Sequence, residues 1–131
     1  MAKIGKFLVN WLPAVIWMSI IFYFSSRTRT VVSESYLLSF IFFKTLHVIE
    51  YAALYFLIFR GFYLSESKIP IAKKCLFALI ISVIYAASDE LHQTLVPTRE
   101  GRIRDVFIDS LSIFMMYIYV SRNIKFLKKY L

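Results

Sequence analysis

Apolar positions along the chain gather in four long segments with short polar connections between them. The segments run over about residues 8–24, 45–64, 72–95 and 103–120. Each approaches the roughly 20 residues that an α-helix needs to cross the core of a bilayer, and the second helix is expected to begin as early as Tyr36. Strands of a membrane barrel would alternate polar and apolar residues, and no such alternation is present. The pattern predicts an all-α integral membrane protein: four transmembrane helices in an up-down bundle, forming a single domain over residues 1–131.

The composition strengthens this prediction. Hydrophobic residues make up 60% of the chain, which has only three Gly and three Pro, as suits a chain whose solvent is lipid. Bulky residues rather than a small-residue cleavage site end the first segment, so we expect it to be retained as a span. Cys75 is the only cysteine, so no intrachain disulfide can form. We expect Cys75 to be a small apolar residue near a helix end.

The charge predicts an orientation. The net charge is +8, from 16 Lys and Arg against 8 Asp and Glu. Up-and-down folding places both termini and the loop after the second segment on one side, and that side holds most of the cations. Because cytoplasmic loops carry an excess of Lys and Arg, both termini are predicted to be cytoplasmic. No nucleic-acid-binding motif is present, so the basic balance indicates contact with membrane lipid rather than with nucleic acid.

Polar residues form stripes on three of the predicted helices. They are Lys44, His47, Glu50 and Tyr51 on the second; Ser82, Tyr85, Asp89, His92 and Gln93, with Glu90 at the edge, on the third; and Arg102, Asp105, Asp109 and Ser112 on the fourth. A charged side chain at the centre of a span costs about 2.5–3.5 kcal/mol, so such residues usually face a protein interior or a wet cavity. Alternating helix directions bring the polar ends together, which predicts one extracytoplasmic polar cleft.

The mixture of charges suits an anionic ligand. A His beside a carboxylate is a common general acid or base, so His47, Glu50, Asp89, Glu90 and His92 are the candidates for proton transfer. The candidates for ligand binding are Lys44, Gln93, Arg99, Arg102, Asp105 and Asp109, with Arg104 as a further cation. Arg27 and Arg29 are interpreted as an exposed loop. The same charges could instead neutralise one another as packing interactions between helices.

We expect no cofactor and no resident metal, with a divalent metal as an alternative. His47 with Glu50, and Asp89 with His92, have the i, i+3 spacing that di-metal carboxylate bundles use. However, the ligands are few, and Lys44 and the nearby arginines would repel a cation.

Four motifs carry a family resemblance. They are Phe24-Ser25-Ser26; Lys44-x-x-His47-x-x-Glu50-Tyr51 with Arg60; Ser88-Asp89-Glu90-Leu91-His92-Gln93; and Pro97-x-Arg99-x-Gly101-x-x-x-Asp105-x-x-x-Asp109. In this order and spacing they resemble the VanZ-like family of small bacterial membrane proteins, named after a teicoplanin-resistance protein. Ser112 stands where members often have Gly, and Asp109 where Asn is also common. The resemblance implies a multi-pass protein of the bacterial cell membrane with a link to glycopeptide (teicoplanin) resistance.

Three functions fit these observations. The first is binding or processing of an anionic cell-envelope molecule, either lipid-linked or related to the cell wall, in the predicted cleft. The second is a membrane-embedded hydrolase or transferase with a His–carboxylate pair, although Ser25, Ser26 and Ser88 lack a recognisable nucleophile motif. The third is a structural or partner-binding protein in which the polar network holds the helices together. A transporter is less favoured, because no inverted repeat or broken helix is present. The ligand, catalysis and oligomeric state stay open.

Overall fold

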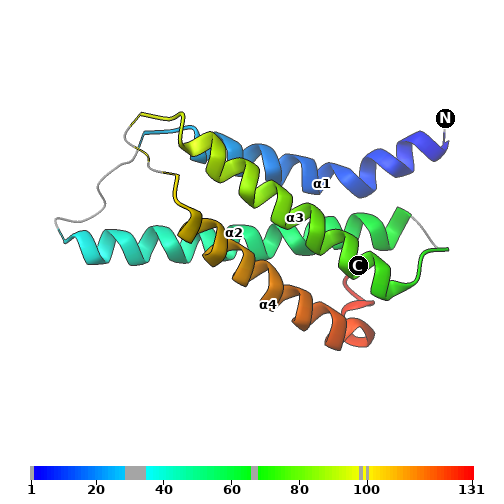
Figure 1. Cartoon of the computed structure of the whole chain (residues 1–131). Helices are drawn as coiled ribbons and strands as arrows, with labels where there is room; N and C mark the ends of the chain where they lie inside the picture. The colour runs from blue at the N-terminus through cyan, green and yellow to red at the C-terminus, as the bar shows by residue number, and fades with distance from the viewer. Residues whose placement is uncertain (1, 29–34, 66–67, 98, 100) are drawn as a thin grey trace.

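The computed structural model describes residues 2–28, 35–65, 68–97, 99 and 101–131, with only the backbone described at residues 2–4 and 36. Within this part of the chain it contains four α-helices and no strand. They are α1 (Ala2–Ser25), α2 (Tyr36–Ser65), α3 (Ile71–Gln93) and α4 (Ile103–Leu127). Successive helices run in opposite directions (Figure 1). The prediction of an all-α fold with four helices is therefore confirmed.

The helix ends differ from the predicted segments where local chemistry intervenes. The helix α2 begins at Tyr36, at the early start that was predicted. The helix α3 ends at Gln93, before the predicted end at residue 95. There the backbone tightens, because the N–H groups of Thr94 and Leu95 bond three residues back to Leu91 and His92. Pro97 follows, and the residue before a proline is disfavoured in a helix.

The helices α2 and α3 form the centre of the bundle. Each contacts the other and both outer helices, whereas the described residues of α1 and α4 make no contact with each other. The largest fully buried side chains belong to α2 and include Tyr51, Tyr55 and Phe59. On the α1 side, Trp11 packs on Gly61 so closely that a Cβ there would lie 3.0 Å from the indole ring. The result is a bundle in which α1 and α4 cover opposite sides of the α2–α3 pair.

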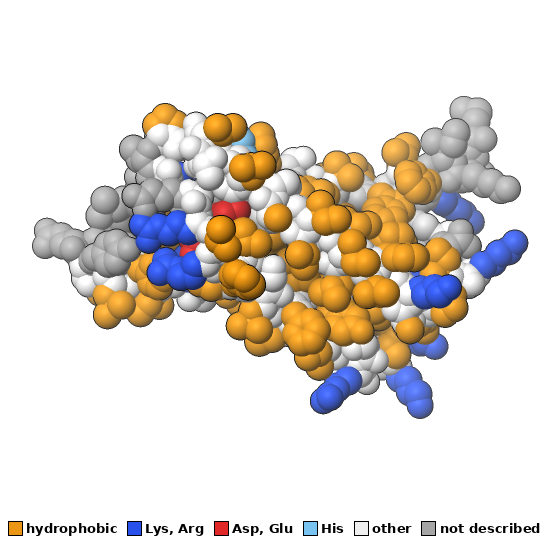
Figure 2. Space-filling model, in the orientation of Figure 1, with side chains coloured by type: hydrophobic (Ala, Val, Ile, Leu, Met, Phe, Trp, Pro, Cys, Tyr) orange, Lys and Arg blue, Asp and Glu red, His pale blue; other side chains and the backbone are white. Residues whose placement is uncertain are grey.

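Three of the helices are long and apolar enough to cross a membrane, over Gly5–Ser25, Leu37–Ser65 and Ile71–Gln93. The helix α4 is not among them, since polar residues lie along much of its length, from Asp105, Asp109 and Ser110 near its start to Arg122 and Asn123 near its end. Figure 2 shows hydrophobic side chains over the middle of the visible face and Lys and Arg side chains toward its two ends. This arrangement is consistent with a multi-pass membrane protein.

Candidate functional site

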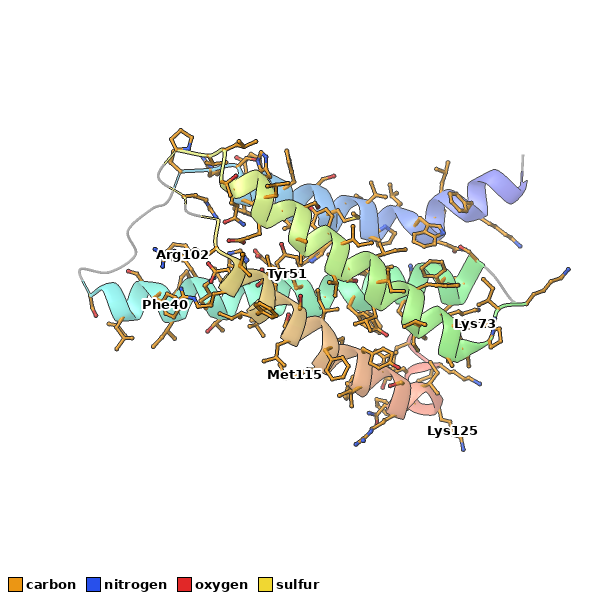
Figure 3. All side chains as sticks on the ribbon, viewed as in Figure 1. Phe40, Tyr51, Lys73, Arg102, Met115 and Lys125 are labelled. Atoms are coloured by element: carbon orange, nitrogen blue, oxygen red, sulfur yellow. The ribbon has the colours of Figure 1, made fainter. Side chains whose placement is uncertain are left out.

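The helices α1 and α3 end, and α2 and α4 begin, at the same end of the bundle (Figure 1). A cavity of about 590 Å³ lies at this end. It is lined by Ile21, Phe24, Ser25, Arg27 and Thr28; by Phe40, Phe42, Phe43, Lys44, Leu46, His47 and Glu50; and by Gln93, Arg99, Arg102, Arg104 and Asp105. Phe40 and Arg102 lie near this end of the bundle and Tyr51 deeper, while Lys73 and Lys125 lie near the opposite end (Figure 3). The volume is within the range of about 300–1,000 Å³ that is typical of small-molecule sites.

Cations outnumber carboxylates in the lining. The cations are Arg27, Lys44, Arg99, Arg102 and Arg104, and the carboxylates are Glu50 and Asp105. Lys44 Nζ lies 2.8 Å from Asp105 Oδ1, joining α2 to α4. The same carboxylate oxygen lies 3.5 Å from Arg104 Nε, and the Arg104 guanidinium lies 5.4 Å from the centre of the Phe40 ring. One carboxylate thus holds two cations at the rim, and their summed charge stays positive.

Arg99 joins the α3–α4 connection to the end of α1. Its Nη2 and Nε atoms donate to the carbonyl oxygens of Phe24 and Arg27, both at 2.8 Å, and its Nη1 donates to Gln93 Oε1 at 3.2 Å. The last carbonyls of a helix have no partner within the helix, and a cation there also interacts favourably with the helix dipole. Arg99 therefore closes one side of the cavity by capping α1.

Asp89 connects three helices directly behind the cavity wall. Its Oδ1 accepts a hydrogen bond from the Ser25 hydroxyl at 2.6 Å. Its Oδ2 accepts from the Tyr51 hydroxyl and from Gln93 Nε2, both at 2.9 Å. The carboxyl group is buried, and Ser25 and Gln93 themselves line the cavity. Asp89 thus fixes the position of two lining side chains from α1 and α3.

Glu90 plays a comparable part for α4. Its Oε1 accepts a hydrogen bond at 2.8 Å from the backbone N–H of Arg102, the residue that caps the N-terminus of α4. A carboxylate is favourable beside the positive end of a helix dipole. Gly101 lies against the same turn of α3, since a Cβ there would be 2.5 Å from the carbonyl oxygen of Glu90. The α3–α4 connection is therefore held tightly on α3.

His47 and Glu50 face the cavity together. Both line it, and His47 Nδ1 lies 3.9 Å from Glu50 Oε2, beyond hydrogen-bond distance. The Nδ1 atom is buried without a hydrogen-bond partner. The backbone carbonyl of Glu50 accepts from Trp17 Nε1 at 2.9 Å, which packs α1 on α2 just below the cavity. A His and a carboxylate are a common pairing of general acid and base.

The structure does not bring every predicted site residue to the cavity. Asp89 and Glu90 lie behind its wall, as described above. His92 turns toward α1, where its Nε2 lies 3.0 Å from the Ser26 hydroxyl and its ring packs on Phe22. Asp109 is 1% exposed within the helix bundle, and its Oδ1 has no hydrogen-bond partner. His92 and Asp109 were predicted to share the cleft, but neither of them lines the cavity.

Some lining residues were outside the predicted site. Arg27 lies in an exposed loop after α1, as interpreted from the sequence, and it also lines the cavity. Arg29, Thr98 and Glu100 lie outside the described residues. The sequence did contain a signal for Phe40. It lies four residues before Lys44 and seven before His47, a spacing that places all three on one face of a helix. Among the described residues, no three His, Cys, Asp or Glu side chains gather in a way that could hold a metal ion.

Comparison with known proteins identifies the family of this chain. A family model described as VanZ/LLP1 matches residues 9–124, a range that contains every residue lining the cavity. No curated protein and no solved structure matches the chain significantly. Since the family match covers most of the chain and agrees with the motif resemblance, the protein belongs to the VanZ/LLP1 family.

Proposed function

We propose that this membrane protein binds or processes an anionic molecule of the bacterial cell envelope, lipid-linked or related to the cell wall, in the cavity at the end of its bundle. The observation that carries the proposal is the excess of cationic over carboxylate side chains in the lining. Charge-assisted hydrogen bonds from Lys and Arg suit phosphate and carboxylate groups. A contribution to glycopeptide (teicoplanin) resistance belongs to the same proposal, and the teicoplanin susceptibility of cells with and without the protein tests it.

The proposal includes a topology: four spans in the bacterial cell membrane, with both termini in the cytoplasm. The helix α4 would be the fourth span, because it packs against two of the apolar helices and its carboxylates at the start are covered by protein. A reporter enzyme that is active only in the cytoplasm should then be active when it is fused after Leu131. A reporter enzyme that is active only after export should be active when it is inserted after Thr28. An exported reporter at Leu131 would contradict the four-span topology.

Binding is tested with the protein in phosphatidylcholine nanodiscs, using phosphatidic acid as a phosphate-bearing probe and diacylglycerol as the neutral control. We expect phosphatidic acid to bind at least about tenfold more tightly than diacylglycerol. Lys44→Gln should weaken phosphatidic acid binding by about tenfold or more, since a hydrogen bond to a charged group contributes about 1.5–3 kcal/mol. Native mass spectrometry measures both affinities. If neither phosphatidic acid nor glycerol 3-phosphate binds, anion binding is ruled out.

The same experiment separates a ligand site from packing between helices. In the packing alternative Lys44 matters only through Asp105, so the double variant Lys44→Gln with Asp105→Asn should regain wild-type behaviour. In a ligand site the lost donor is not replaced, so the double variant should still bind phosphatidic acid more weakly than the wild type. Regained affinity in the double variant would favour the structural role.

A membrane hydrolase or transferase is the second candidate, favoured by the position of His47 and Glu50 in the cavity. Proton transfer between them would need a bridging water or a closer approach than 3.9 Å. Conversion of a bound phosphate lipid, detected by mass spectrometry and lost in His47→Gln protein, would support catalysis. Binding without conversion across phosphate lipids and lipid-linked precursors would count against it.

A further inference from the structure

The cavity has two chemically different walls. The start of α4 and the α3–α4 connection contribute Arg99, Arg102, Arg104 and Asp105, with Lys44 opposite them on α2. On the α1 side, Ile21 and Phe24 precede the polar residues Ser25, Arg27 and Thr28 at the end of the helix, and α2 adds Phe42 and Leu46. An anion that is soluble in water would occupy only the polar wall. The apolar wall therefore calls for a second, apolar part of the occupant.

The apolar wall also reaches the outer surface of the bundle. Phe24, Phe42 and Leu46 line the cavity while 50%, 47% and 39% of each residue is exposed. Ile41 and Ile49, which lie close to these residues on α2, are also exposed. Below the cavity α1 and α2 are joined by the bond from Trp17 Nε1 to the Glu50 carbonyl. The apolar border of the cavity thus lies between the end of α1 and the start of α2, on a surface that would face acyl chains.

We propose that the occupant is a phosphate-bearing lipid that enters sideways from the bilayer. Its headgroup would lie at Lys44, Arg102 and Arg104, and its chain would pass between α1 and α2 beside Phe24 and Leu46. This inference rests on the proposed function and narrows it from anionic molecules in general to membrane lipids. Charge complementarity fixes the headgroup end, and the exposed apolar border fixes the direction of the chain. A volume of about 590 Å³ holds a headgroup and the first part of a chain, so the rest of the chain stays in the bilayer.

The test uses a bulky side chain to narrow the apolar opening of the cavity between α1 and α2. Leu46→Trp places a larger ring at the cavity border, whereas Ile84→Trp places it on α3, at an exposed residue that does not line the cavity. In phosphatidylcholine nanodiscs, Leu46→Trp is expected to weaken phosphatidic acid binding by about tenfold, as overpacking of a filled site would. Glycerol 3-phosphate, the headgroup alone, should bind the variant as it binds the wild type. Ile84→Trp should change neither affinity.

A second readout locates the chain itself. Phosphatidic acid with a diazirine on an acyl carbon near the glycerol should cross-link to peptides containing Phe24, Phe42 or Leu46. Cross-links confined to other parts of the protein would overturn the inference. So would wild-type protein that binds glycerol 3-phosphate as tightly as phosphatidic acid with no effect of Leu46→Trp, a result that leaves anion binding intact. Failure of both probes to bind would instead remove the proposed function along with the inference.

Discussion

Replacing Asp89 with leucine is expected to lower the free energy of unfolding by about 2–4 kcal/mol, the larger of the two stability effects expected here. The carboxyl group accepts hydrogen bonds from Ser25, Tyr51 and Gln93, on three different helices. A buried donor left without an acceptor costs about 1–3 kcal/mol, and hydrogen bonds in membrane bundles average about 0.6 kcal/mol. Three hydrogen bonds at about 0.6 kcal/mol each give the lower value of about 2 kcal/mol, and buried donors left without an acceptor raise the loss toward about 4 kcal/mol. The fully buried Tyr51 hydroxyl should account for most of it, since Ser25 retains the Phe22 carbonyl as an alternative acceptor.

The measurement can use the single cysteine as a reporter. Cys75 is buried and unpaired, so a thiol-reactive dye reports unfolding of the bundle in detergent. The matched control is Asp89→Leu combined with Tyr51→Phe, which removes the orphaned hydroxyl together with its acceptor. This double variant should recover about 1–3 kcal/mol relative to Asp89→Leu alone, which is the cost of a buried donor without an acceptor. Equal stability of wild-type protein and Asp89→Leu would show that the hydrogen bonds to Asp89 contribute nothing to the bundle.

The helices could be predicted from the sequence because their signal is carried by length and composition. Runs of apolar residues separated by short polar connections leave an α-helix as the one element that satisfies its own backbone in lipid. The fourth helix shows the limit of this argument. Asp105 and Asp109 interrupt its apolar run, so composition alone does not make α4 a span. Only the packing of α4 on α2 and α3 shows how its carboxylates are covered.

Part of the candidate site followed from helical periodicity. Lys44, His47 and Glu50 share a face of α2, and the structure places all three in the cavity lining. Periodicity gives the face of one helix, but it does not give the rotation of that helix between two neighbours. On α3, Gln93 points to the cavity while His92, one position away, packs on α1. That division depends on where α1 ends, which no property of α3 encodes.

The hydrogen-bond partners of Arg99 could not be predicted, for a different reason. Arg99 makes its contacts with the backbone carbonyls of Phe24 and Arg27, and carbonyl groups are present at every residue. No pattern of side chains along α1 could therefore indicate that an arginine from a distant loop would cap it. The motif containing Arg99 marked the residue, but the structure identifies its partners. As a result, the arginine expected to hold the ligand also holds the wall of the cavity.

The tight fit of the α3–α4 connection leads to the second prediction with a large effect. Gly101→Ala is expected to lower the free energy of unfolding by about 1–3 kcal/mol, the usual cost of overpacking. A Cβ at residue 101 would lie 2.5 Å from the carbonyl oxygen of Glu90 and 3.2 Å from the backbone nitrogen of Thr94. Both atoms belong to the backbone, so neither can rotate away as the end of a side chain could. The connection itself must move.

Movement of the connection should also reach the cavity, because Arg99 and Arg102 flank Gly101 and both line it. The hydrogen bond from the Arg102 N–H to Glu90 is 2.8 Å long and would break first. We therefore expect Gly101→Ala to weaken phosphatidic acid binding as well as to lower the unfolding temperature reported by Cys75. Gly5→Ala is the matched control, because a Cβ there meets nothing within 4 Å, and it should change neither measurement. Unaltered stability and binding in Gly101→Ala would mean that the connection does not need to lie against α3, and that Glu90 does not position Arg102.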